Sequence, residues 1–299
     1  MKKLIPTLVL ITIAFFLNAQ NNYDKFQAYL QKGDTTKQFS LLEKWKKESP
    51  KDAELYTSLF NYYFSASKNE IIVINSGQPP KGQNALILKN STDQIAGFID
   101  SQINYEQSNL KLAFESIDKG IKLYPNRLDM RFGKIYALGQ IKDWKSFTNE
   151  IIKTINYSTT NDNKWAWTFN EQREGGQKMF LSSLQDYQVQ LYNTMNDKLL
   201  VNMQEISKAV LKHYPKHIES LSNLSIAYLV EKEFDKALGP LLKAEVINPK
   251  DFIVLNNIAY AYRESGNKEK AISYYEKVIQ YGDHQAKTQA EKEIQNLNK

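Results

Sequence analysis

Residues 218–251, IESLSNLSIAYLVEKEFDKALGPLLKAEVINPKD, align without gaps with residues 252–285, FIVLNNIAYAYRESGNKEKAISYYEKVIQYGDHQ, at an offset of 34 residues. The shared positions are those that an antiparallel helical hairpin buries: Leu221 and Leu255, Leu224 and Ile258, Tyr228 and Tyr262, Ala237 and Ala271, Leu241 and Tyr275, and Ala244 and Val278. A fixed period of this length is typical of stacked repeats, because one hairpin cannot bury its apolar faces alone. The pattern predicts an extended surface that holds another molecule rather than an enclosed catalytic pocket.

The two units resemble tetratricopeptide repeats. That family places large apolar residues at positions 4, 7 and 11 and small ones at 8, 20 and 27, which suits Ser225 and Ala259 at position 8. Pro249 falls at the frequent proline position, and Gly266 lies at the turn between two helices. The resemblance covers about a quarter of the chain. One departure is Pro240, which is expected to kink its helix because it removes a backbone hydrogen bond.

The resemblance implies an all-α fold, a right-handed superhelical solenoid of helix-turn-helix repeats. Weaker units precede the clear ones, since Pro50, Pro125 and Pro215 each follow an amphipathic segment. We therefore divide the chain into a signal peptide (1–19), N-terminal helical repeats (20–67), an inserted β-hairpin or loop (68–104), helical hairpins (105–155), an irregular insert (156–174), a long helical hairpin (175–217), two repeats (218–251 and 252–285) and a C-terminal capping helix (286–299).

The insert over 68–104 differs from the repeats in its residue pattern. Residues 71–74, IIVI, and residues 85–88, ALIL, are short apolar runs of strand type, and residues 75–82 between them have turn composition. Residues 95–99 form a third candidate for extended structure. We predict a small β-hairpin here, and a partly ordered loop is the alternative.

The first nineteen residues have the form of an export signal. Lys2 and Lys3 precede an apolar run of 14 residues, which is shorter than a bilayer requires, and Ala19 offers a cleavage site. An uncleaved anchor is the alternative. The chain has no cysteine, so neither a disulfide nor a lipid-modified cysteine can form. We expect an exported protein, periplasmic or extracellular, without an integral membrane segment after signal removal and possibly in a membrane-associated complex.

Charge and motifs exclude several classes of function. The net charge of +6 includes the two leader lysines, and no dense basic stripe is present, so nucleic acid is a poor candidate partner. The nucleophile elbow, the phosphate-binding glycine loop and the dinucleotide fingerprint are all absent. His213 and His217 are four residues apart, but Pro215 between them prevents a shared helical face. We expect no catalytic residues, no cofactor and no metal.

A protein or peptide is the expected partner, because first helices in the resembled family line a concave groove. The candidate groove residues of the two clear repeats are Ser222, Asn223, Ile226, Asn256, Asn257, Tyr260 and Arg263. Some family members clamp a terminal carboxylate with lysines, but this chain has Ser222 and Asn256 at position 5. Tyr260 and Arg263 can still pair with an acidic or aromatic group.

Trp165 and Trp167 are further candidates for partner binding. Alternation places both on one side of an extended segment, either exposed as anchors or buried to fix the insert. The function we infer from the sequence is a non-enzymatic exported scaffold or adaptor. Two alternatives remain: an enzyme whose site lies between the inserts and the solenoid, and a structural envelope protein that associates with itself.

Overall fold

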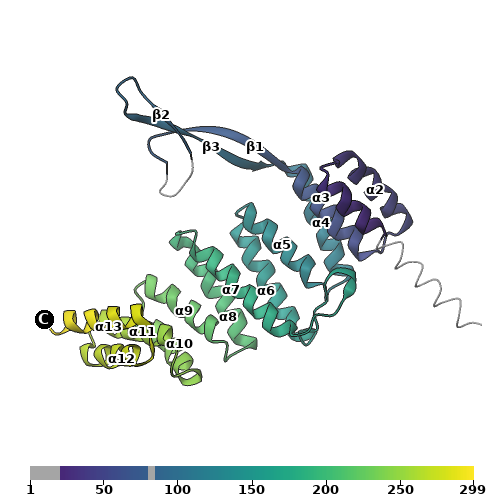
Figure 1. The fold of residues 1–299 in the computed structure, drawn as a ribbon. Helices are drawn as coiled ribbons and strands as arrows, with labels where there is room; N and C mark the ends of the chain where they lie inside the picture. Colours follow the sequence, from purple (N-terminus) through teal and green to yellow (C-terminus); the bar gives the residue numbers. More distant parts are fainter. Residues whose placement is uncertain (1–20, 80–84) are drawn as a thin grey trace, which may run out of the picture. The chain divides into compact units, whose positions relative to one another are not determined.

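The structure, a computed structural model, describes residues 21–79 and 85–299, so the expected signal peptide at 1–19 lies outside the described residues. Paired α-helices make up most of this part, together with one small antiparallel sheet (Figure 1). The predicted fold class, an all-α helical-repeat solenoid with a small β insert, is confirmed. The chain divides into two compact units: residues up to 137 with 166–172, and residues 138–165 with 173–299.

The first unit is built from short helices that begin at acidic caps. It contains helical residues 21–31 and the elements α2 (Thr35–Glu48), α3 (Ala53–Ala66), α4 (Gln107–Leu123), most of α5 (Leu128–Gln140) and the short η1 (Thr168–Asn170). Asp34 and Asp52 cap α2 and α3, because each carboxylate accepts a hydrogen bond from a backbone N–H of the first turn. The core of these first helices comprises Phe26, Leu42, Trp45, Leu55, Tyr56 and Leu59.

The insert is a three-stranded antiparallel sheet between α3 and α4. Its strands are β1 (Lys68–Ser76), β2 (Leu86–Lys89) and β3 (Ile95–Tyr105), in the spatial order β1-β3-β2. The third candidate segment therefore forms the central strand, and the two apolar runs 71–74 and 85–88 pair with it rather than with each other. The sheet extends away from the end of α3 (Figure 1).

The second unit is a series of helices in which α6 packs against α8 and, from α7 onward, each packs against the next. Its elements are α6 (Trp144–Thr160), α7 (Gly176–Tyr192), η2 (Asp197–Leu199), α8 (Leu200–His213), α9 (Ile218–Val230), α10 (Phe234–Ile247), α11 (Phe252–Glu264), α12 (Lys268–Tyr281) and α13 (His284–Leu297). Helices α8 to α13 contact one another in chain order, and α9 also contacts α7 and α11. This is the arrangement of stacked hairpins, in which first helices of neighbouring repeats lie together.

The positions that repeat at 34 residues form the core of the last two hairpins. Of the twelve matched side chains, all except the half-buried Tyr228 are buried. Leu241, for example, is fully buried, and burial of a side chain of this size stabilises the fold by about 1.5–3 kcal/mol. Helix α13 covers the open end, and Ala290 joins the same core.

Pro240 does not end its helix. Helix α10 runs through it as one element of 14 residues, and the next buried residue, Leu241, still lies in the core. The missing N–H leaves the carbonyl of Lys236 without its usual helical donor. Packing of Ala237, Leu241 and Ala244 against the neighbouring helices outweighs this loss.

Candidate functional site

The candidate groove residues lie on α9 and α11 of the second unit. Ser222, Ile226, Asn256, Asn257 and Tyr260 are all half-buried, so part of each side chain faces solvent. Their placement on first helices agrees with the family resemblance. The role of these residues in holding a partner stays a prediction.

Two of the candidate groove residues already have partners within the protein. Asn223 is buried, and its amide donates to Oε1 of Gln185 on α7 at 2.6 Å. Arg263 donates to Oε2 of Glu293 on α13 at 2.6 Å, and its guanidinium lies 4.8 Å from the Tyr260 ring centroid. Asn223 therefore joins α7 to α9, and Arg263 joins α11 to the capping helix.

Trp165 is fully buried in the second unit. Its ring packs against Phe180, with the centroids 5.3 Å apart, and against Tyr157 at 6.0 Å. Trp167 belongs to the first unit, is half-buried, and meets Phe132 edge to face at 6.2 Å. The structure thus places the two tryptophans in different aromatic clusters, and Trp165 offers no surface to a partner in this conformation.

A buried ion network lies at the centre of the first unit. The Arg127 guanidinium donates to both carboxylate oxygens of Glu54, at 2.6 and 3.1 Å, and to both of Asp129, at 2.9 and 2.7 Å. Arg127 and Glu54 are 1% and 2% exposed. Burial alone would lower the pKa of Arg127, but the hydrogen bonds to Asp129 and Glu54 raise it above its ordinary value. The arginine therefore stays charged at every pH at which the protein is folded.

The network also holds the segment 166–172. The backbone N–H of Phe169 donates to Oε1 of Glu54 at 2.8 Å, and Ala166 exchanges backbone hydrogen bonds with Asn126 and Leu128. Phe169 has a φ of 59°, in the left-handed region that side chains other than glycine disfavour. The hydrogen bond to Glu54 offsets this local strain, because it gives a buried carboxylate a further donor.

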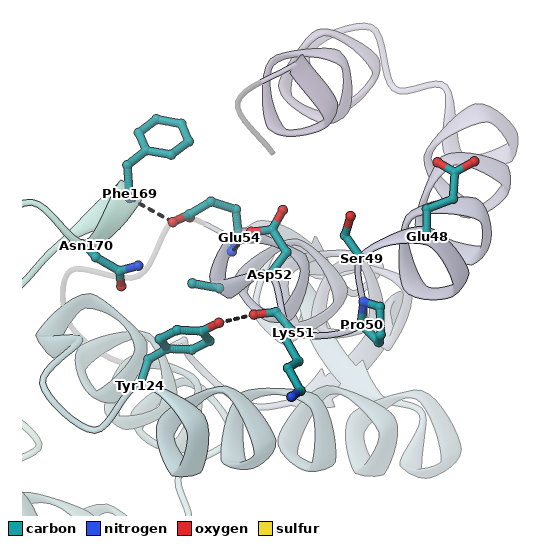
Figure 2. A pocket seen from close by; sticks show the side chains of 10 residues that line it. Glu48, Ser49, Pro50, Lys51, Asp52, Glu54, Tyr124, Phe169 and Asn170 are labelled. Atoms are coloured by element: carbon teal, nitrogen blue, oxygen red, sulfur yellow. Dashed lines mark hydrogen bonds between the residues drawn. The ribbon is translucent and has the colours of Figure 1, made fainter. Parts of the chain in front are cut away.

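An open cavity of about 600 Å³ borders this segment. It is lined by residues 48–54 at the α2–α3 connection together with Tyr124, Phe169 and Asn170 (Figure 2). The Tyr124 hydroxyl donates to the backbone carbonyl of Lys51, which ties α4 to the floor of the cavity. Ser49 reaches the same space, and its side chain has no hydrogen-bond partner among the described residues.

A smaller cavity of about 180 Å³ lies on another side of Glu54. Its lining includes Tyr23, Asn61, Asp129, Trp167 and Thr168. Burial raises the pKa of the Tyr23 hydroxyl, and the negative charges of Glu54 and Asp129 raise it further. The hydroxyl therefore stays protonated well above neutral pH and is available as a hydrogen-bond donor in an electronegative setting.

Several titratable groups of the described residues are engaged in contacts within the protein. Among the described residues no group of three or more histidine, cysteine, aspartate or glutamate side chains could hold a metal ion. His213 pairs with the Asn156 amide oxygen at 2.9 Å, and His217 caps α9 through Ser220. Glu54 and Asp129 are both engaged by Arg127. Glu48 and Asp52 also line the larger cavity, where Asp52 accepts a hydrogen bond from Nε1 of Trp45 at 2.8 Å and burial raises its pKa.

Sequence reasoning did not find the Glu54–Arg127 network, because the two residues are 73 positions apart and ion pairs have no periodic signature. The one available signal was local. Arg127 lies directly before a helix that carries Asp129 in its first turn, which is an arrangement that invites a hydrogen bond across two residues.

Comparisons with known proteins agree with this description. The tetratricopeptide repeat family model matches residues 253–281, so the resemblance is confirmed for the last repeat. Among curated protein sequences, none matches this chain. No helix in the described ranges 21–79 and 85–299 is long and apolar enough to cross a bilayer.

Several solved structures are similar in fold. The first is YrrB, a TPR protein described as having an unusual peptide-binding site: 16% identity, 84% of this chain and 97% of YrrB covered, TM-score 0.41. PilF of Pseudomonas aeruginosa is 11% identical over 92% of this chain and 97% of its own, with a TM-score of 0.38. MamA is 15% identical over 60% and 87%, with a TM-score of 0.36. We assign no residue role from these likenesses.

Proposed function

We propose that the protein is a non-enzymatic scaffold that binds a protein or peptide through the exposed faces of its helical repeats. The observation that carries the proposal is the open cavity of about 600 Å³ in the first unit, which is large enough for one or two side chains of a partner. The half-buried candidate residues on α9 and α11 provide a second, solvent-facing surface on which a partner can bind.

The setting we propose is outside the cytoplasm, in the periplasm or beyond the cell. It rests on the basic and apolar composition of residues 1–19 and on the absence of cysteine from the whole sequence. A fold stabilised by burial alone, with no thiol to oxidise, suits an oxidising compartment. Fractionation of the native cell, followed by N-terminal sequencing, tests the location and the cleavage site together.

Filling the cavity tests the binding function. Ser49 points into it, and its backbone bonds do not depend on its side chain, so Ser49→Trp obstructs the open space without removing a hydrogen bond. Ser65→Trp, on the exposed part of α3, is the matched control. Affinity capture from the native cell should recover a partner with the unchanged protein and with the control, and less of it with Ser49→Trp. Equal recovery of the partner by both variants would show that the cavity is not the binding site. Recovery of no partner by the unchanged protein would contradict the proposed binding function.

A further inference from the structure

The sheet inserted between α3 and α4 carries an apolar face that no described residue covers. We define this apolar face as Ile72 and Ile74 of β1, Leu86 and Leu88 of β2, and Ile99 and Ile103 of β3. The face is separate from the repeat surfaces on which the proposed function rests.

Strand register places these residues on one side. In an antiparallel pair, residues directly opposite each other project to the same face. Ile74 of β1 and Leu86 of β2 both lie opposite Ile99 of the central strand, and Ile72 lies opposite Ser101. Ser101 in turn hydrogen-bonds to Glu70, which is where the face becomes polar near the helices.

The opposite face of the sheet has a different composition. It carries Asp100, Gln102 and Asn104 of the central strand, while Phe98 on that side is buried. Its exposed apolar side chains, Ile71 and Ile87, are only 42% and 36% exposed. The apolar exposure is therefore greater on the face of Ile72 and Ile74. An exposed apolar sheet face normally packs against a second layer.

The exposed area of the apolar face is large for a monomer. Ile72 is 77% exposed, Ile74 71%, Leu86 65% and Ile103 53%. Side chains of this size at these exposures present roughly 450 Å² of contiguous apolar surface, which lies in the range that marks an interaction site.

Charge indicates what kind of partner fits. Residues 68–105 contain three lysines and three acidic residues, so the insert has no net charge while the whole chain carries +6. A neutral insert has no electrostatic attraction to anionic lipid or nucleic acid. An uncharged apolar face is, however, complementary to a second copy of itself.

We propose that the apolar faces of two copies of this chain pack against each other about a two-fold axis. Two such faces together bury roughly 900–1,000 Å², which is close to the area of about 1,000 Å² that a specific interface needs. Sheets that pack face to face lie about 10 Å apart with their side chains interdigitated. The expected product is a weak dimer that forms and dissociates with concentration.

Sedimentation velocity of the purified exported protein over a hundredfold range of concentration tests the proposal. The mass should rise from monomer to dimer as the concentration increases. The double variant I72S/I74S should raise the dissociation constant at least tenfold. Val246→Ser, at an 84% exposed aliphatic position on α10, is the matched control and should leave association unchanged. Circular dichroism should show the same helix content for all three proteins.

The cysteine-free sequence permits a second measurement on the same face. A single cysteine at Ile74 should give a covalent dimer with a short bismaleimide crosslinker, and one at Val246 should not. A monomer at every concentration, or association unaffected by I72S/I74S, would overturn the proposal. So would a monomer that binds phosphatidylcholine vesicles through Ile72 and Ile74, since the face would then hold lipid. None of these outcomes bears on partner capture by the repeats.

Discussion

Replacement of Arg127 by methionine should destabilise the first unit more than any single surface change. The substitution keeps a long side chain but removes four charge-assisted hydrogen bonds, two to Glu54 and two to Asp129. Glu54 is 2% exposed and would be left charged without its main donors. Breaking a buried pair in this way typically costs about 3–5 kcal/mol, against a total stability of about 5–15 kcal/mol for a domain.

Urea denaturation followed by far-UV circular dichroism gives the free energy of unfolding for each variant. Lys89→Ala is the control, because Lys89 forms an ion pair of 2.9 Å with Asp93 in the same unit but both side chains are more than half exposed. It should cost less than about 1 kcal/mol. The contrast tests whether burial, rather than distance, decides the contribution of an ion pair.

A double variant sharpens the same test. Glu54→Gln keeps the shape and still accepts from the N–H of Phe169, but removes the negative charge that Arg127 balances. In the E54Q/R127M double variant the loss should therefore be smaller than the sum of the two single losses, by more than about 1 kcal/mol. Additive losses, or an Arg127→Met protein as stable as Lys89→Ala, would show that Glu54 is not a buried charge dependent on Arg127.

Three further experiments have defined outcomes. A Cβ at Gly120 would lie 2.9 Å from Cβ of Tyr56, so Gly120→Ala should lower the free energy of unfolding by about 1–3 kcal/mol in thermal denaturation. Gly133→Ala on α5 is the control: its Cβ would meet only the Phe60 ring, at 3.4 Å, so it should be neutral or stabilising by up to about 1 kcal/mol. Burial lowers the pKa of His217 in the folded state, so the neutral imidazole contributes fully to stability above the pKa of the unfolded chain, near 6.5, and this contribution declines as the pH falls below that value. His217→Asn can still cap α9 and should flatten the dependence of the unfolding free energy on pH between pH 7 and 5. An unchanged pH dependence would count against burial of His217 as the cause. Asp251→Ala removes the carboxylate that caps α11 and should cost about 1 kcal/mol by chemical denaturation, with no change in helix order.

The regular part of the fold could be predicted from the sequence because its signal is repeated. Leu221 and Leu255, or Ala237 and Ala271, must each fill the same gap between helices, so packing imposes the same residue type at the same interval. The insert was also predictable in kind, since its β-branched runs and turn residues contrast with the helical period. Its strand order was not, because the central position of β3 depends on pairing over a distance.

The candidate site was less accessible to sequence reasoning. The sequence predicts that Arg263 faces a partner. Its contact with Glu293 depends on where the capping helix α13 packs, and no local sequence pattern determines that position. Trp165 and Trp167 alternate as a strand would, but Trp165 is fully buried against Phe180 and Trp167 is half-buried beside Phe132, which depends on the helices packed around each. Such long-range polar contacts and loop conformations follow from the assembled fold rather than from its period.

Photo-crosslinking in the native cell tests whether the helical repeats hold a protein or peptide partner. A photoreactive residue is placed at Ser49 in the cavity, at Asn256 on α11, or at Val246 as an exposed control. Ser49 or Asn256 should capture a discrete protein or peptide that Val246 does not. No captured protein or peptide at either position, or the same products at all three, would contradict the conclusion that these repeats form a binding surface.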